Sequence, residues 1–65
     1  MRFYAYEVKG TDGEEEPFYH SGEVMEDNVT KAFDYAMKAS LTVLEKEKKR
    51  CPYTVSSIRI ALLLV

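Results

Sequence analysis

Apolar and polar residues alternate along two short stretches near the N-terminus, and this two-residue period predicts β-strands. The first stretch is Arg2–Lys9, and its two faces carry Tyr4, Tyr6 and Val8 against Phe3, Ala5 and Glu7. The second is Phe18–Met25, and its faces carry Phe18, His20, Gly22 and Val24 against Tyr19, Ser21, Glu23 and Met25. Turn chemistry at Gly10–Gly13 and the solvated Glu14–Glu16 separate them, which predicts a hairpin with a long loop.

The period changes to that of a helix after Glu26. Asp27 or Asn28 is placed to accept hydrogen bonds from the first turn, and apolar residues then recur on one stripe. They are Val29, Ala32, Phe33, Ala36, Met37, Leu41 and Leu44, with Ala39 and Val43 beside them. The basic residues of Lys46–Arg50 suit the negative end of a helix dipole, and Pro52 ends the helix, so we expect it to run to Arg50.

The last stretch, Tyr53–Val65, predicts a third strand. Strict alternation puts Ser56, Ile58, Ile60, Leu62 and Leu64 on the core face, and Val55, Ser57, Arg59, Ala61, Leu63 and Val65 on the other. Beyond Arg59 both faces are apolar, which is unusual for a sheet with one solvated side.

These elements predict one α+β domain over residues 1–65 with the order β-β-α-β. The expected sheet is antiparallel with strand order 2-1-3, and one long helix packs on one of its faces. A chain of 65 residues buries only about 60% of its unfolded surface, so we expect a small core.

Cysteine and histidine each occur once, as Cys51 and His20, which leaves no internal disulfide and no zinc-binding set. The single cysteine and the lack of a signal-peptide pattern lead us to expect a cytoplasmic protein. No nucleophile–base pair, phosphate-binding loop or metal motif is recognisable, so we expect neither enzymatic activity nor a cofactor. His20 is interpreted as an ordinary strand residue and Cys51 as a residue at the helix end.

Charge divides the chain more sharply than any motif. Residues 1–27 have a net charge of −6 and residues 28–65 of +4, although the whole chain carries only −2. A dense acidic surface is able to occupy a basic groove on a protein that handles nucleic acid. We therefore predict a protein-binding surface, with Tyr19 and Tyr6 as aromatic anchors, formed by the acids Glu14, Glu15, Glu16, Glu23, Glu26 and Asp27. The alternative is that these acids only confer solubility.

Two other surfaces compete with the acidic one. The apolar C-terminal strand is able to pair with a second copy, which makes the protein a monomer or a homodimer. The basic end Lys46–Arg50 is able to contact phosphate weakly, but helix capping also accounts for it. We expect neither direct nucleic-acid binding nor membrane association.

In its small size, its acidic charge and its β-β-α-β layout, the whole chain resembles small phage-encoded inhibitors, above all anti-CRISPR proteins of type I systems. That group shares no diagnostic motif, so no single residue carries the resemblance. It implies a protein partner, a subunit of the Cascade surveillance complex in the host cytoplasm. The acidic surface is then expected to compete for a DNA-binding groove. The basic helix end departs from a uniformly acidic mimic and favours a local acidic face.

Overall fold

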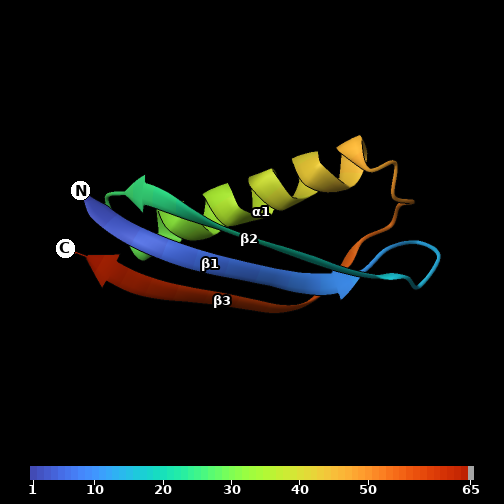
Figure 1. Cartoon of the computed structure of the whole chain (residues 1–65), viewed down its shortest axis with the longest axis horizontal. Coiled ribbons are helices and arrows are strands. Elements are labelled where there is room, and N and C mark those ends of the chain that lie inside the picture. Colours follow the sequence, from blue (N-terminus) through green and yellow to red (C-terminus); the bar gives the residue numbers. More distant parts are fainter. Residues whose placement is uncertain (65) are drawn as a thin grey trace.

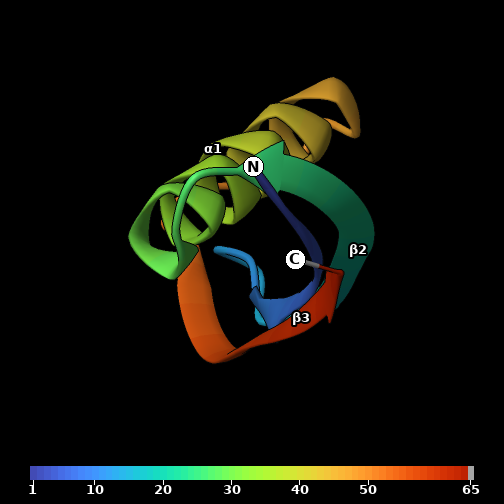
Figure 2. The same cartoon turned by 90° about the vertical axis from the view of Figure 1, so that its left-hand side faces the viewer.

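The computed structural model describes residues 1–64, with the backbone alone at Leu64. It contains the strands β1 (Arg2–Thr11), β2 (Pro17–Glu26) and β3 (Thr54–Leu64) and the helix α1 (Val29–Lys46). The strands form an antiparallel sheet in the order β2-β1-β3, and α1 lies across one face of it (Figures 1 and 2). The α+β class, the strand order and the single covering helix are thus confirmed.

The hairpin between β1 and β2 is tighter than the sequence pattern predicts. Gly10 and Thr11, predicted to be turn residues, continue β1 and pair with Phe18 and Pro17. The loop is closed by Asp12, whose buried carboxylate accepts hydrogen bonds from the backbone N–H groups of Glu14 (2.8 Å) and Glu16 (3.0 Å). Because the carboxylate folds the loop back onto itself, the strands extend further than the glycine and aspartate signals indicate.

Helix α1 begins as predicted and ends earlier. The Asn28 side chain caps its first turn by accepting a hydrogen bond from the N–H of Lys31 at 3.0 Å. The prediction that the helix reaches Arg50 is wrong, because Lys48 adopts a left-handed φ of 58°. Lys48 N–H then bonds to the Glu45 carbonyl and Lys49 N–H to that of Leu44, which is a Schellman termination. This motif usually uses glycine, so a lysine in its place left no signal in the sequence.

Strand β3 departs from strict alternation at two bulges. Its register on β1 is regular from the Lys9–Ser57 pair to the Tyr4–Leu62 pair and shifts at both ends of that stretch. The shift next to Ser57 places Val55 opposite the buried Gly10 and against the core. The prediction that Ser56 shares the core face while Val55 lies opposite is therefore wrong at this end. The predicted core face is correct for Ile58, Ile60 and Leu62, which pair with the buried Val8, Tyr6 and Tyr4. Val65 lies outside the described residues.

The core lies between α1 and the β1–β2 side of the sheet. Its buried apolar residues are Tyr4, Tyr6, Val8, Phe18, Val24, Ala32, Ala36 and Leu44. The alanines bring the helix close to the sheet, and Ser40 joins them by bonding its hydroxyl to the Ala36 carbonyl at 2.8 Å. The helix packs mainly on β2 and β1 and hardly reaches β3. The opposite face of the sheet is left without a second layer (Figure 2).

The Tyr6 phenol is buried under α1, and its hydroxyl lies 3.1 Å from Nε2 of His20. Burial, and then the neighbouring Tyr35, raise the pKa of Tyr6 above its ordinary value of 10.0. The unfolded chain therefore loses this proton at a lower pH than the folded chain does. The contribution of the protonated Tyr6 to the free energy of unfolding is therefore fully present below about pH 10, and it is lost as the pH rises through the raised pKa.

We expect the substitution Tyr6→Phe to flatten the alkaline loss of stability. Urea unfolding of both proteins between pH 8 and pH 11 measures this. At pH 8 the variant is less stable by about 1 kcal/mol, because it lacks the hydrogen bond to His20. The difference should narrow as the pH rises above 10, and a gap that stays constant to pH 11 would contradict the assignment.

Candidate functional site

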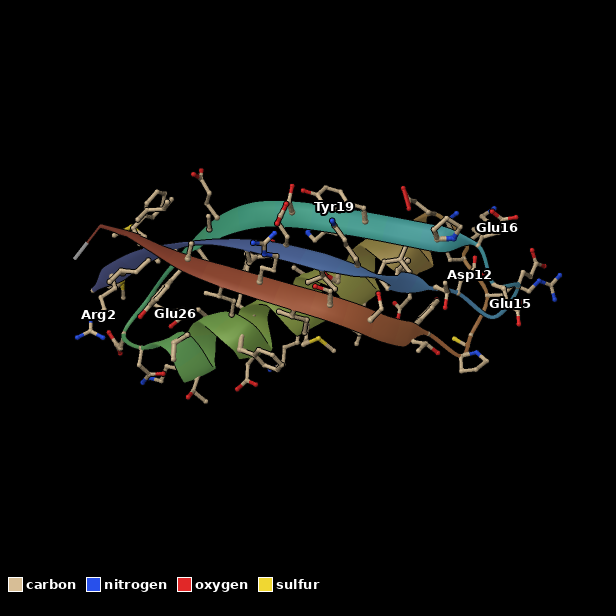
Figure 3. All side chains as sticks on the ribbon, turned by 90° about the horizontal axis from the view of Figure 1, so that it is seen from below. Arg2, Asp12, Glu15, Glu16, Tyr19 and Glu26 are labelled. Atoms are coloured by element: carbon tan, nitrogen blue, oxygen red, sulfur yellow. The ribbon has the colours of Figure 1, made fainter. Side chains whose placement is uncertain are left out.

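One face of the sheet is not covered by α1, and Figure 3 views the molecule from this side. The register directs every second residue of each strand to it. These residues are Phe3, Ala5, Glu7 and Lys9 from β1, Tyr19, Ser21, Glu23 and Met25 from β2, and Ser57, Arg59 and Ala61 from β3. We call this surface the open face. It combines aromatic, apolar and charged side chains, as protein-binding surfaces commonly do.

Tyr19 is held in a fixed position on the open face, although its side chain is 55% exposed. Its hydroxyl donates a hydrogen bond of 2.8 Å to Oε1 of Glu7 on the adjacent strand. The Nζ atom of Lys9 lies 5.8 Å from the centre of its ring, on a cation–π contact. An aromatic side chain that is already ordered loses little conformational entropy on binding, which favours Tyr19 as an anchor.

Tyr6, the other predicted anchor, does not lie on this surface. It pairs with Gly22, and both face α1, whereas Tyr19 pairs with Lys9 on the open face. The register of the hairpin therefore separates the two tyrosines to opposite sides of the sheet. Sequence reasoning missed Glu7 and Lys9, which belong beside Tyr19. The alternation of side chains along each strand puts Glu7 and Lys9 on one face of β1, but it shows which residues of β2 lie beside them only once the pairing of the strands is known.

The predicted acidic residues divide between the two ends of β2 (Figure 3). Glu14, Glu15 and Glu16 lie in the hairpin loop, and Glu26 and Asp27 lie at the far end next to α1. Glu23 is the one member of the predicted set on the open face between them. The structure therefore arranges these acids along β2 and not as one compact cluster.

Ion pairs neutralise part of each acidic end. The Nε atom of Arg50 lies 3.0 Å from Oε1 of Glu14, and Nζ of Lys31 lies 3.3 Å from Oδ2 of Asp27. Among the described residues, Glu15, Glu16 and Glu23 form no ion pair, and all three are exposed. Because both ion pairs are exposed and screened by solvent, each contributes little to stability.

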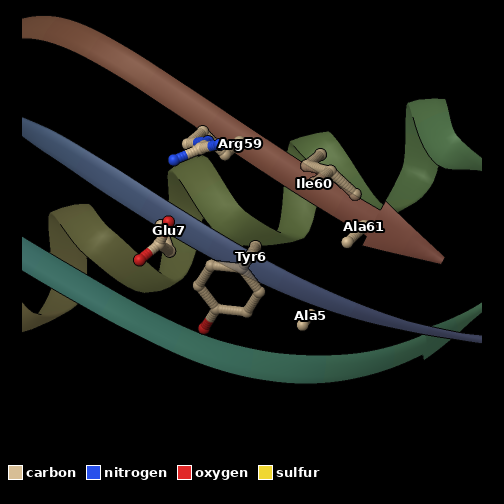
Figure 4. A pocket seen from close by; sticks show the side chains of 6 residues that line it. All are labelled: Ala5, Tyr6, Glu7, Arg59, Ile60 and Ala61. Carbon is tan, nitrogen blue, oxygen red and sulfur yellow. The ribbon is translucent and has the colours of Figure 1, made fainter. Parts of the chain in front are cut away.

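Concave sites also interrupt the surface of the described residues. A hollow of about 410 Å³ lies where the small residues Ala5 and Ala61 pair, and Glu7 and Arg59 flank it (Figure 4). A more apolar groove of about 560 Å³ runs between α1 and β2, where it is lined by Tyr6, His20, Tyr35, Lys38, Ala39, Thr42 and Val43. In this groove the His20 ring contacts the Tyr6 hydroxyl, which accounts for the histidine as a structural partner.

Other chemistry proposed or dismissed from the sequence is also located. Cys51 is exposed in the connection after α1, as a free thiol. Within residues 1–64 no group of three or more His, Cys, Asp or Glu side chains is arranged to hold a metal ion. The basic residues Lys46, Lys48 and Arg50 are exposed around the end of α1, and Arg50 contacts Glu14.

Comparison with models of protein families, with curated proteins and with solved structures finds no match to this chain. Within the described part of the chain, no helix combines the length and the apolar character that crossing a membrane requires.

Proposed function

We propose that this protein is a non-catalytic binding module that inhibits a nucleic-acid-handling protein complex by docking its open face on a basic surface. The observation that carries the proposal is Tyr19, a half-exposed aromatic side chain fixed by Glu7 and Lys9 on a sheet face without a covering layer. Tyrosine is one of the residue types that are enriched at the binding hot spots of protein interfaces.

The open face itself carries two acids, Glu7 and Glu23, and two bases, Lys9 and Arg59, so the net negative charge that favours a basic partner comes from the adjoining hairpin loop. Glu15, Glu16 and Glu23 are exposed and form no ion pair among the described residues; Glu15 and Glu16 lie in the loop that leads into β2, and Glu23 lies on β2 with Tyr19. Such charges speed up association with a positively charged groove and select against acidic partners. The resemblance to type I anti-CRISPR proteins makes the DNA-binding groove of a Cascade complex the first partner to test.

The experiment is a DNA-binding competition with purified type I Cascade and its double-stranded target. We expect the protein to reduce the fraction of DNA bound, and the inhibition to weaken as the salt concentration rises. The double variant Glu15→Lys/Glu16→Lys should require at least ~10-fold more protein for half-inhibition, because reversed charges repel a basic groove. Tyr19→Ala should be impaired to a similar degree.

The double variant Glu45→Lys/Glu47→Lys is the matched control. It makes the same change of charge at exposed positions at the end of α1, away from the open face. It should inhibit as the unmodified protein does. Absence of inhibition by the unmodified protein, or equal losses in both double variants, would refute the proposal.

A further inference from the structure

An apolar patch lies on the helix side of the sheet, beyond the part that α1 covers. Tyr35, Ala39 and Val43 of α1 face the groove toward β2. Phe33 and Leu41 lie on the other flank of the buried row of α1, toward β3, because of the helical period. They are 43% and 40% exposed, and Leu62 of β3 is 50% exposed. We call the surface formed by Phe33, Leu41 and Leu62 with the half-buried Ile58 and Ile60 the β3 patch.

Between its two bulges, the free edge of β3 carries little of the protection that soluble proteins give to edge strands. The other edge of the sheet, β2, begins with Pro17 and carries Glu23 and Glu26. Proline and charges of this kind prevent pairing with another strand. In β3, by contrast, Arg59 is the one charged residue, and the ladder between its two bulges is regular from Ser57 to Leu62. This edge is therefore suited to accept a further strand.

The molecule also exposes more surface than a compact monomer of its size. Its accessible area is 4630 Å², whereas a compact 7.5 kDa protein exposes about 4,250 Å². Its radius of gyration is 12.2 Å, against about 10.8 Å for a compact 65-residue domain. The surplus is consistent with a sheet that α1 covers only in part and on one face.

We propose that β3 pairs antiparallel with β3 of a second copy, which creates a two-fold symmetric dimer with one continuous six-stranded sheet. A second copy is the suitable occupant because the edge is complementary to itself. With the two-fold axis at Ile60, Ile60 faces its twin and Ile58 faces Leu62 of the second copy. All three apolar side chains of the patch's strand then meet apolar partners.

The same register also keeps the two Arg59 side chains of the dimer apart. Arg59 lies opposite Ala61 of the second copy, whereas an axis at Arg59 would place two arginines directly against each other. Arg59 keeps Glu7 as its neighbour on β1. The dimer therefore forms without a like-charge pair across the seam.

The helices complete the interface. Both copies of α1 lie on the same face of the joined sheet, one on each side of the seam. Adjacent strands are about 4.8 Å apart, and each helix lies over β1 and β2, so a gap remains above the two β3 strands. Phe33 and Leu41 of each helix project into this gap over Ile58, Ile60 and Leu62. The two β2 edges and both copies of Tyr19 stay free.

Sedimentation equilibrium from 5 to 500 µM tests the proposal. We expect the unmodified protein to approach twice its 7.5 kDa chain mass. Leu62→Lys buries an unpaired charge at the seam and should raise the dissociation constant at least ~100-fold, as should Phe33→Lys on the helix. Circular dichroism checks that both monomers remain folded, and two variants on different elements guard against a folding defect in one.

Met25→Lys is the matched control, because Met25 is 55% exposed on the opposite edge strand. This variant should dimerise as the unmodified protein does. A monomer mass at every concentration, an assembly larger than a dimer, or equal dissociation by Met25→Lys would overturn the proposal. Because the measurement uses no partner, it is independent of the proposed inhibition.

Discussion

Replacing Gly10 by alanine is expected to destabilise the protein by about 3 kcal/mol or more. A Cβ atom at this position would overlap the backbone carbonyl oxygen of Thr54 and lie 2.8 Å from Cζ of the Phe18 ring. Gly10 belongs to the central strand, so it cannot move away from β3 without weakening the sheet. A chain of this size has a total stability of about 3–10 kcal/mol, so a large fraction of the variant should be unfolded.

Gly22→Ala is the control for this prediction. A Cβ atom there would meet the hydroxyl end of the Tyr6 side chain at 2.7 Å and no backbone atom among its nearest neighbours. A side-chain tip moves at a lower cost than a strand does, so we expect a loss of about 1 kcal/mol, mostly from the hydrogen bond to His20. Urea unfolding of both variants gives the comparison. A Gly22→Ala variant as unstable as Gly10→Ala would contradict this reasoning.

The parts of the fold that depend on local chemistry were predictable from the sequence. Alternation placed Tyr4, Tyr6 and Val8 on one face of β1, and the structure buries all three. Asn28 was one of two predicted caps, and its side chain is the one that accepts the bond. The strand order followed from the single long helix, which has to cross the sheet before β3 pairs with β1.

The errors arise where tertiary contacts override the pattern. The bulge at Ser56 is an extra residue in one strand, and alternation cannot locate it without the partner strand. The left-handed Lys48 ends α1 although lysine ordinarily favours a helix. Both features occur around the connection from α1 to β3, where the chain has to turn back to the sheet.

Some residues of the candidate site were predictable from the sequence, but the surface that they form together was not. The sequence identified Tyr19 and Glu23, which share a strand face. It could not place Glu7 and Lys9 beside them, because that requires the register of the hairpin. Nor could it show that α1 leaves part of β3 uncovered, since one apolar stripe fits either position of the helix on the sheet.

Two leucines of α1, one in the core and one on the flank of the apolar stripe, are expected to differ strongly in their effect on stability. Leu44 is 3% exposed in the core, whereas Leu41, less than one turn earlier, is 40% exposed. Leu44→Ala should reduce the free energy of unfolding by about 2–5 kcal/mol, because it removes buried methyl groups and leaves a cavity. Leu41→Ala should change it by less than about 0.5 kcal/mol, because it affects only the surface of the monomer. Urea unfolding at low micromolar concentration measures both.

The same pair separates folding from association. If the β3 patch is a dimer seam, Leu41→Ala weakens the dimer at high concentration while the monomer keeps its stability. Leu44→Ala has the converse effect, since its side chain belongs to the core and not to the patch. A Leu41→Ala variant as unstable as Leu44→Ala would mean that α1 packs over β3 more closely than the structure has it. An unchanged dissociation constant in Leu41→Ala would mean that α1 does not contribute to the dimer interface, which would then rest on the pairing of the β3 edges alone.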